Sequence, residues 1–398
     1  MNSKVKLFDV IYSKTACFII NVIVLLSYCY LNQVQGFHTL VEYLCYLMTI
    51  TMFIIYILNG KYSSLLIVLA IYILFLCFSS VVGQYSSLID CIKVYHKILF
   101  ISMYIDLGIK ENCKNIISGL YYSFAIIVLI NFYTIIKYPN GLYADTVYTN
   151  NWFLKYDNFH IFFYFPTIAL LIINNKNKNK KYNLFDKLVI IAITYSVYYC
   201  FSANTVVAYT LFIIYILFKK QIDKIKKFNS KNYFIVFLGI FLGIVILRMQ
   251  NLFSWLIVDI LGKNLTFTSR TLIWDRILEL IKNKPIIGYG VETNIIMSMK
   301  LGNPHYTHAH NTILDVIYKG GFVSIIPFIM LLIIPIKELY NNKENSLSKT
   351  LSFIMLCILT MMNFEAREDK IGLYIILIIC FNISVIIKNY NQESHLSK

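Results

Sequence analysis

The stretch "THAHNTILDVIYKGGFVSIIPFIMLLIIPI", residues 307–336, places histidines directly before a long apolar run. The whole chain contains seven histidines, and three of them, His305, His308 and His310, fall within six residues. The run at 313–336 is long enough to cross a bilayer core, which requires about 17–25 apolar residues in a helix. We interpret this segment as a membrane-spanning helix with imidazoles at its outer end.

The composition extends this interpretation to the rest of the chain. Of its 398 residues, 58% are hydrophobic and only 14% are charged, and the mean hydropathy is +0.66. Soluble domains are typically about 45–50% apolar and about 25% charged. A soluble domain of this length could not bury so much apolar surface. We therefore predict an all-α, polytopic integral membrane protein, with residues 1–398 forming a single membrane domain.

Apolar runs of similar length recur from one end of the chain to the other. The first lacks a small-residue cleavage site, so we interpret it as a helix and not as a removable signal peptide. About twelve transmembrane helices are predicted, at 16–31, 40–58, 63–82, 90–107, 116–136, 160–174, 188–201, 204–218, 233–248, 313–336, 350–364 and 371–387.

The basic residues follow these spans and indicate their orientation. Lysines concentrate in alternate loops, including "NKNKNKK" (175–181) and "KKQIDKIKK" (219–227). The opposite short loops, 32–39 and 83–89, contain no Lys or Arg. Because cytoplasmic loops carry the positive charge, both termini are predicted to be cytoplasmic in a multi-pass protein of the cell membrane. The net charge of +16 is therefore explained by the orientation of the spans and by basic loops that lie near anionic lipid headgroups. No nucleic-acid partner is expected.

The longest segment on the opposite side, residues 249–312, is predicted to be a large extracytoplasmic loop. Loops of this length are usually functional. Within it, apolar residues recur at helical spacing from Thr268 to Lys284, where Thr268 or Ser269 could cap the start. We predict an amphipathic helix along the membrane surface, whose N-terminus and adjacent Arg270 can bind phosphate. The alternative is a packing helix whose arginines only contact headgroups.

Three interpretations of the histidine cluster remain open. The cluster could bind a metal, but no acidic or thiol side chain stands at the usual ligand spacing. It could be polar without chemistry, or one imidazole could exchange protons near neutral pH. Asn311 adds an amide able to hold a sugar hydroxyl.

The nine cysteines are scattered singly, and the chain has no P-loop, Rossmann fingerprint, GxSxG or HExxH motif. No metal, nucleotide or other cofactor is therefore expected.

Four stretches together resemble the bacterial O-antigen polymerase and O-antigen ligase family, also called Wzy-type polymerases. Members carry a Ser-Gly-Arg…Trp motif leading into an amphipathic helix, then Pro-x-x-Gly-x-Gly, then His-Asn opening a span with a Gly-Gly element. Here the similar stretches are 269–274, 285–290 and 310–314 with Gly320 and Gly321. "NWFLKYDNFH" (151–160) is similar to a further polymerase stretch, with Asn158 in the Asn position.

The chain departs from the family pattern at two places. The Gly that usually precedes the motif arginine is missing. Many relatives also carry Ser-Arg-Thr after the seventh span, where this chain has Ser202-Ala203-Asn204-Thr205. One phosphate-binding arginine is therefore unaccounted for, and Arg248, Arg276 or Lys155 could replace it.

The resemblance implies glycan transfer on the outer face of the membrane. The donor would be an oligosaccharide on undecaprenyl diphosphate, and the acceptor a hydroxyl of another lipid-linked repeat unit, giving capsule, O-antigen or exopolysaccharide. Arg270 would stabilise the leaving diphosphate and His310 would accept the hydroxyl proton. The remaining residues expected to bind substrate are Arg276, Asn311, Asn158, Arg248 and His308.

Two alternatives to a polymerase remain. A ligase would transfer finished glycan to a lipid or protein acceptor, but the Asn-, Ile-, Lys- and Tyr-rich composition is typical of an AT-rich genome and favours a polymerase. A flippase or other transporter would place charged residues within its spans. In this chain only the predicted span at 90–107 carries such a cluster, with Lys93, His96 and Lys97. A polymerase would also be expected to work with a separate flippase and a chain-length regulator.

Overall fold

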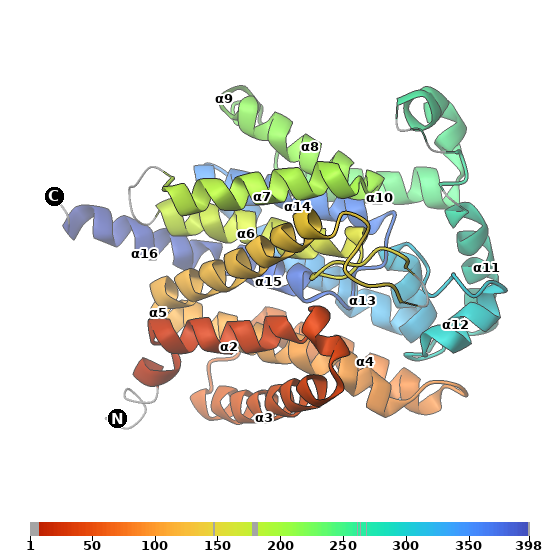
Figure 1. The fold of residues 1–398 in the computed structure, drawn as a ribbon, viewed down its shortest axis with the longest axis horizontal. Coiled ribbons are helices and arrows are strands. Elements are labelled where there is room, and N and C mark those ends of the chain that lie inside the picture. The colour runs from red at the N-terminus through yellow and green to blue at the C-terminus, as the bar shows by residue number, and fades with distance from the viewer. Residues whose placement is uncertain are drawn as a thin grey trace. The chain divides into compact units, whose positions relative to one another are not determined.

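The computed structural model describes residues 8–145, 148–176, 182–260, 262, 264–267 and 269–396. Within these ranges the chain is helical, and its only strand-like pairings are isolated bridges (Figure 1). The α-helices are α2 (Lys14–Leu26), α3 (Gln35–Asn59), α4 (Ser64–Val82), α5 (Leu88–Lys137), α6 (Asp157–Lys176), α7 (Leu184–Cys200), α8 (Ala203–Leu217), α9 (Lys219–Ile222), α10 (Ser230–Ile240), α11 (Arg270–Asn283), α12 (Asn294–Leu301), α13 (Thr312–Asn341), α14 (Ser346–Met362), α15 (Ile371–Phe381) and α16 (Ile383–Leu396). Short 3₁₀ or π-helical segments occur at Tyr30–Gln33, Phe241–Ile246, Met249–Phe253 and Trp255–Ile260.

Four helices in the described ranges, α3, α4, α5 and α13, are long and apolar enough to cross a membrane. A bent pair, Ile371–Phe381 with Ile383–Tyr390, is a fifth if it counts as one span. Shorter apolar helices include α2, α8 and α14. The all-helical class is thus confirmed with several candidate spans, while the count of about twelve stays a prediction. The spans predicted at 90–107 and 116–136 lie in one helix, α5, whose backbone breaks only at Asn112 (φ −148°, ψ 75°).

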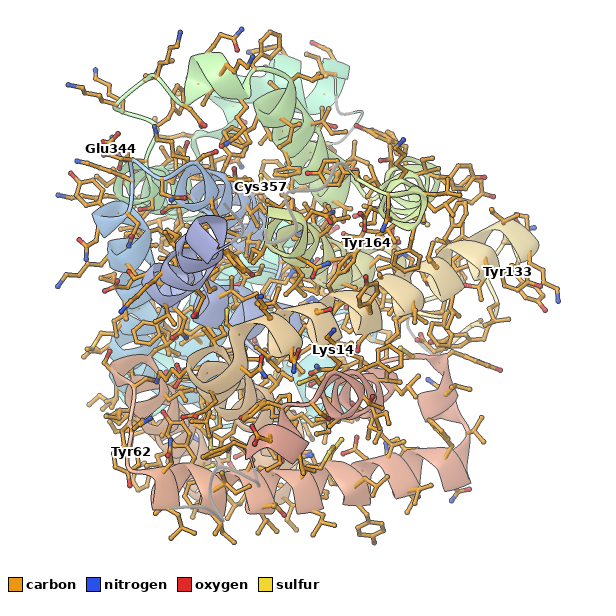
Figure 2. All side chains as sticks on the ribbon, turned by 90° about the vertical axis from the view of Figure 1, so that its left-hand side faces the viewer. Lys14, Tyr62, Tyr133, Tyr164, Glu344 and Cys357 are labelled. Atoms are coloured by element: carbon orange, nitrogen blue, oxygen red, sulfur yellow. The ribbon has the colours of Figure 1, made fainter. Side chains whose placement is uncertain are left out.

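Apolar side chains cover outward faces of the helices as well as their interior. On α3, Tyr43, Leu47 and Ile50 are all more than half exposed. Figure 2 shows Tyr133 extending outward, whereas the fully buried Cys357 lies among the helices. Exposed apolar area on this scale is typical of helices that face lipid.

Two compact units make up the fold. The first is drawn from Met1–Ser63, His96–Val206 and Tyr374–Lys398, and the second from Ser64–Tyr95 and Val207–Leu373. In the second unit α13 packs against α4, α10, α11 and α14. This unit contains the whole segment 249–312 and therefore the histidine cluster.

The amphipathic helix predicted from Thr268 to Lys284 is present as α11, next to α13 in Figure 1. Its apolar stripe is buried as the spacing indicates, with Ile273, Trp274 and Ile277 at most 2% exposed. Leu272 is the exception at 60% exposed. Helix α11 therefore belongs to the packed core of the second unit, and its position along a membrane surface stays a prediction.

Candidate active site

The start of α13 is tied to the loop between α14 and α15. The Asn311 side-chain oxygen accepts a hydrogen bond from the Leu314 N–H (2.9 Å) and so caps α13. Its amide donates to the Asn363 carbonyl (2.9 Å), and the Thr312 hydroxyl donates to the Glu365 carbonyl (2.8 Å). These contacts use both ends of the buried Asn311 amide. They also bring Glu365 to the histidine cluster.

The Glu365 carboxylate is the centre of the site, and its two oxygens have different neighbours. Oε1 contacts His308 Nε2 and lies 3.1 Å from His310 Nδ1. Oε2 lies 3.4 Å from Arg270 Nη2 and 3.9 Å from Arg367 Nη2. Glu365 is 2% exposed. A carboxylate buried among cations stays ionised, and each oxygen can orient a different kind of group.

The charges around Glu365 set its protonation state. Burial alone would raise the pKa of this carboxyl, because it disfavours the charged form. Electrostatic interactions with His310, Arg367 and His308 outweigh burial and hold the Glu365 pKa well below its usual value. Glu365 is therefore an anion at neutral pH.

His310 is kept neutral. Burial is the main cause that lowers its pKa to about 4, and the charges of His308 and Arg270 act in the same direction. His310 Nδ1 lies 3.1 Å from the Glu365 carboxylate but makes no hydrogen bond, and a neutral ring with its proton on Nδ1 would leave the lone pair on Nε2 free. A neutral imidazole in this tautomer can accept a proton through Nε2.

Two arginines meet at the first turn of α11. Arg270 is its first residue and donates through Nη1 to the Phe267 carbonyl (3.4 Å). Arg248 lies over the Trp274 ring (5.1 Å), donates to the Thr271 carbonyl (3.3 Å) and pairs with Asp275. Within the described residues, Arg270 Nε and Arg248 Nη1 are buried without a hydrogen-bond partner. Both guanidinium groups therefore keep a donor available for an anion.

The backbone near this turn is unusual. Ser269 precedes α11 in the left-handed region (φ 68°) and its side chain makes no capping bond, so the prediction that it caps the helix is wrong. Thr268, the other predicted cap, lies outside the described residues. Arg248, Phe267 and His310 also have positive φ values, of 55°, 49° and 48°. Such strained residues often cluster at functional sites.

The Pro-x-x-Gly-x-Gly turn (285–290) docks into a break in α13. The break lies at Gly321 (φ 65°, ψ −172°), where helical hydrogen bonding is interrupted. Main-chain N–H groups at 289 and 290 donate to the carbonyls of 318 and 319 (2.9 and 2.8 Å). In return, the N–H groups of 322 and 323 donate to the carbonyls of 285 and 286 (2.8 and 3.3 Å). The two motifs are therefore one structural unit that fixes the end of α11 to α13.

Gly321→Ala is expected to prevent accumulation of folded protein. A Cβ at this position would lie 2.0 Å from the Ile286 carbonyl oxygen, and the backbone conformation is essentially restricted to glycine. Gly302→Ala is the matched control, because Gly302 also has positive φ (74°) but nothing lies within 4 Å of its Cβ position. The control should cost only about 1–2 kcal/mol. Fluorescence-detected size-exclusion chromatography of both variants measures the difference, and similar profiles would argue against the docking.

The other predicted site residues lie apart from Glu365 or have partners of their own. Arg276 is half-exposed and bonds to Glu279 (2.6 Å) and to the Lys300 carbonyl (3.0 Å). His305 is exposed. Asn158 belongs to the first unit, where its side-chain oxygen accepts a hydrogen bond from Ser202.

Sequence reasoning missed Glu365 and Arg367. Their signal is "FEAREDK" (364–370), which holds five charged residues between two apolar runs. The predicted topology places this short loop on the same side as 249–312.

The sequence argument against a metal also fails in part. His308, His310 and Glu365 each offer one ligand atom, and these three atoms lie within 4.8 Å of one another. The acidic partner missing from the local spacing is supplied from a distant loop.

Comparison with known proteins identifies the segment that contains most of this site. A family model described as O-antigen ligase matches residues 163–329, which include Arg248, Arg270, the docked turn and the histidine cluster. Glu365 and Arg367 lie beyond the matched residues. No curated protein matches the chain significantly. Residues 163–329 are an O-antigen ligase family domain, in agreement with the polymerase and ligase family that the sequence motifs resemble.

Proposed function

We propose that this chain polymerises undecaprenyl-diphosphate-linked oligosaccharide repeat units on the outer face of the cytoplasmic membrane. The observation that carries the proposal is the divided environment of Glu365, with imidazoles on one oxygen and guanidinium groups on the other. Glycosyl transfer from a diphosphate requires these two capacities together: a base for the acceptor hydroxyl and fixed positive charge for the leaving group.

The proposed reaction is a single displacement. The acceptor hydroxyl oxygen attacks the anomeric carbon of the donor sugar, and its proton moves to His310 Nε2. The bond between that carbon and the diphosphate oxygen breaks, and its electron pair leaves with the lipid diphosphate. Arg270 and Arg248, at the N-terminus of α11, stabilise the charge that develops there. Because a diphosphate leaves readily, no acid catalyst, metal ion or nucleotide is needed.

The other residues take supporting roles in this proposal. Arg248 replaces the missing family arginine, since it shares the first turn of α11 with Arg270. Asn311 positions the loop next to His310, because both ends of its amide are used within the protein. His308 holds Glu365 in place. The segment 249–312 faces the outside, and a flippase delivers the substrate there.

The test is a reconstituted reaction with a purified lipid-linked repeat unit as the only glycan. A polymerase gives a ladder of products that grow by whole repeats and remain lipid-linked, with a chelator present. The ligase alternative predicts no ladder until a lipid or protein acceptor is added. Transbilayer movement of the substrate without any new glycosidic bond would favour a transporter.

The pH dependence of kcat/KM should reflect the low pKa of His310. The base is active only when deprotonated, and burial lowers its pKa to about 4. Activity should therefore stay level between pH 7 and pH 5 and fall only as the pH approaches 4. A free histidine would lose activity near its usual pKa of about 6.5. An acidic limb at that value would exclude His310 as the base.

A further inference from the structure

A metal ion could use the geometry of three ligand atoms: His308 Nε2, His310 Nδ1 and Glu365 Oε1. His308 Nε2, His310 Nδ1 and the carboxylate oxygen lie within 4.8 Å of one another. The imidazole rings are 3.9 Å apart between centroids. Two imidazole nitrogens and one carboxylate oxygen are a preferred donor set for zinc and similar divalent cations, which bind them at about 2.0–2.2 Å. Small side-chain movements would bring all three to that distance.

Access and charge allow such a cation to bind. The His308 and His310 side chains are 21% and 18% exposed, so the site can be reached from outside the protein. The two arginines approach the other carboxylate oxygen, Oε2. They leave Oε1 free to act as a ligand, although their positive charge weakens the attraction for a cation. An affinity below that of a dedicated structural zinc site is therefore expected.

We propose that His308, His310 and Glu365 form a binding site for a divalent transition cation of the zinc type, and that its occupation inhibits the protein. The inhibition, unlike the binding, rests on the proposed function. A cation on His310 Nδ1 requires the neutral ring to hold its one proton on Nε2. The nitrogen that would accept the hydroxyl proton then becomes a donor. His308 would bind through Nε2 and turn its Nδ1–H toward the Thr307 hydroxyl, 3.1 Å away.

Binding is tested without reference to activity by titrating the purified, chelator-treated full chain with Co²⁺. The visible absorption of four- or five-coordinate Co²⁺ should appear and be displaced by Zn²⁺. His308→Ala and His308→Gln should each weaken binding by at least about 10–100-fold, because even the loss of an outer partner of a ligand costs that much. His305→Ala, which changes a nearby exposed histidine, should leave the titration unchanged. No absorption in the wild type, or equal affinity in the His308 variants, would overturn the site.

The effect on activity is measured separately. Zn²⁺ should inhibit glycan transfer over the concentrations that displace Co²⁺, and a chelator should restore the full rate. If Co²⁺ binds through His308 but Zn²⁺ does not inhibit, the inhibitory role is overturned along with the assignment of His310 Nε2 as the base. If a chelator abolishes activity, the cation is a cofactor and the inhibitory role is likewise overturned. If no transfer occurs at all, the proposed function fails and the Co²⁺ titration alone decides the site.

Discussion

Replacing His310 with alanine is expected to reduce the rate of chain growth by about 10²–10⁴-fold, the usual contribution of general-base catalysis. The reason is that His310 is a neutral imidazole in the family motif position, with Nδ1 beside the Glu365 carboxylate. Long glycans should almost disappear from cells that carry the variant at normal membrane levels. The measurement is the glycan ladder at equal expression.

The neighbouring histidines supply the controls for this prediction. His305→Ala changes an exposed side chain and should leave the ladder close to wild type. His308→Ala removes a partner of Glu365 but not the base, so chains should become shorter without being lost. Equal severity in all three variants, reproduced by a chelator, would indicate a catalytic metal instead of a histidine base.

Arg270→Lys should lower the rate by about 10²–10³-fold. This is the usual cost of removing one hydrogen-bond donor that stabilises developing negative charge in an enzyme. A lysine keeps the charge, but it cannot hold several oxygens in a planar fork. Arg270 uses one nitrogen for the Phe267 carbonyl and another for Glu365 Oε2, and still keeps Nε for a ligand. The measurement is the rate of donor consumption at saturating substrate.

Arg276→Lys is the matched control for Arg270→Lys. Arg276 lies further along α11, and its side chain is 46% exposed and paired with Glu279. The substitution should change the rate little. If both variants behaved like the wild type, Arg270 would be a residue that only contacts headgroups and the N-terminus of α11 would not be the diphosphate site.

Local patterns predicted the helical elements of this site well. The spacing of Ile273, Trp274 and Ile277 identified α11, and the run after Thr312 identified α13, because both depend on periodicity within one segment. Conformation that depends on tertiary contacts was not predictable in this way. Ser269 has a typical capping side chain but adopts φ 68° and makes no capping bond with that side chain.

The central acid could not be found from spacing. Glu365 reaches the histidines only because Asn311 and Thr312 bond to the loop after α14, more than fifty residues further along the chain. No motif rule relates those positions. The density of charge at 364–370 is unusual for a membrane protein, yet it gives no information about which charge faces which histidine.

The docking of the 285–290 turn into α13 has a consequence for how the proposed polymerase could change its sugar specificity. The turn is held by main-chain hydrogen bonds and close-fitting glycines, and the Tyr289 ring stacks on Tyr318. Exposed positions such as Ile295, Met299 and His305 contribute no side chain to these contacts and can be replaced without disturbing the docked turn. Libraries randomised at such positions should yield variants that accept different glycans at unchanged thermal stability. Under the proposed function, a turn fixed through its backbone leaves the exposed side chains around it free to diversify.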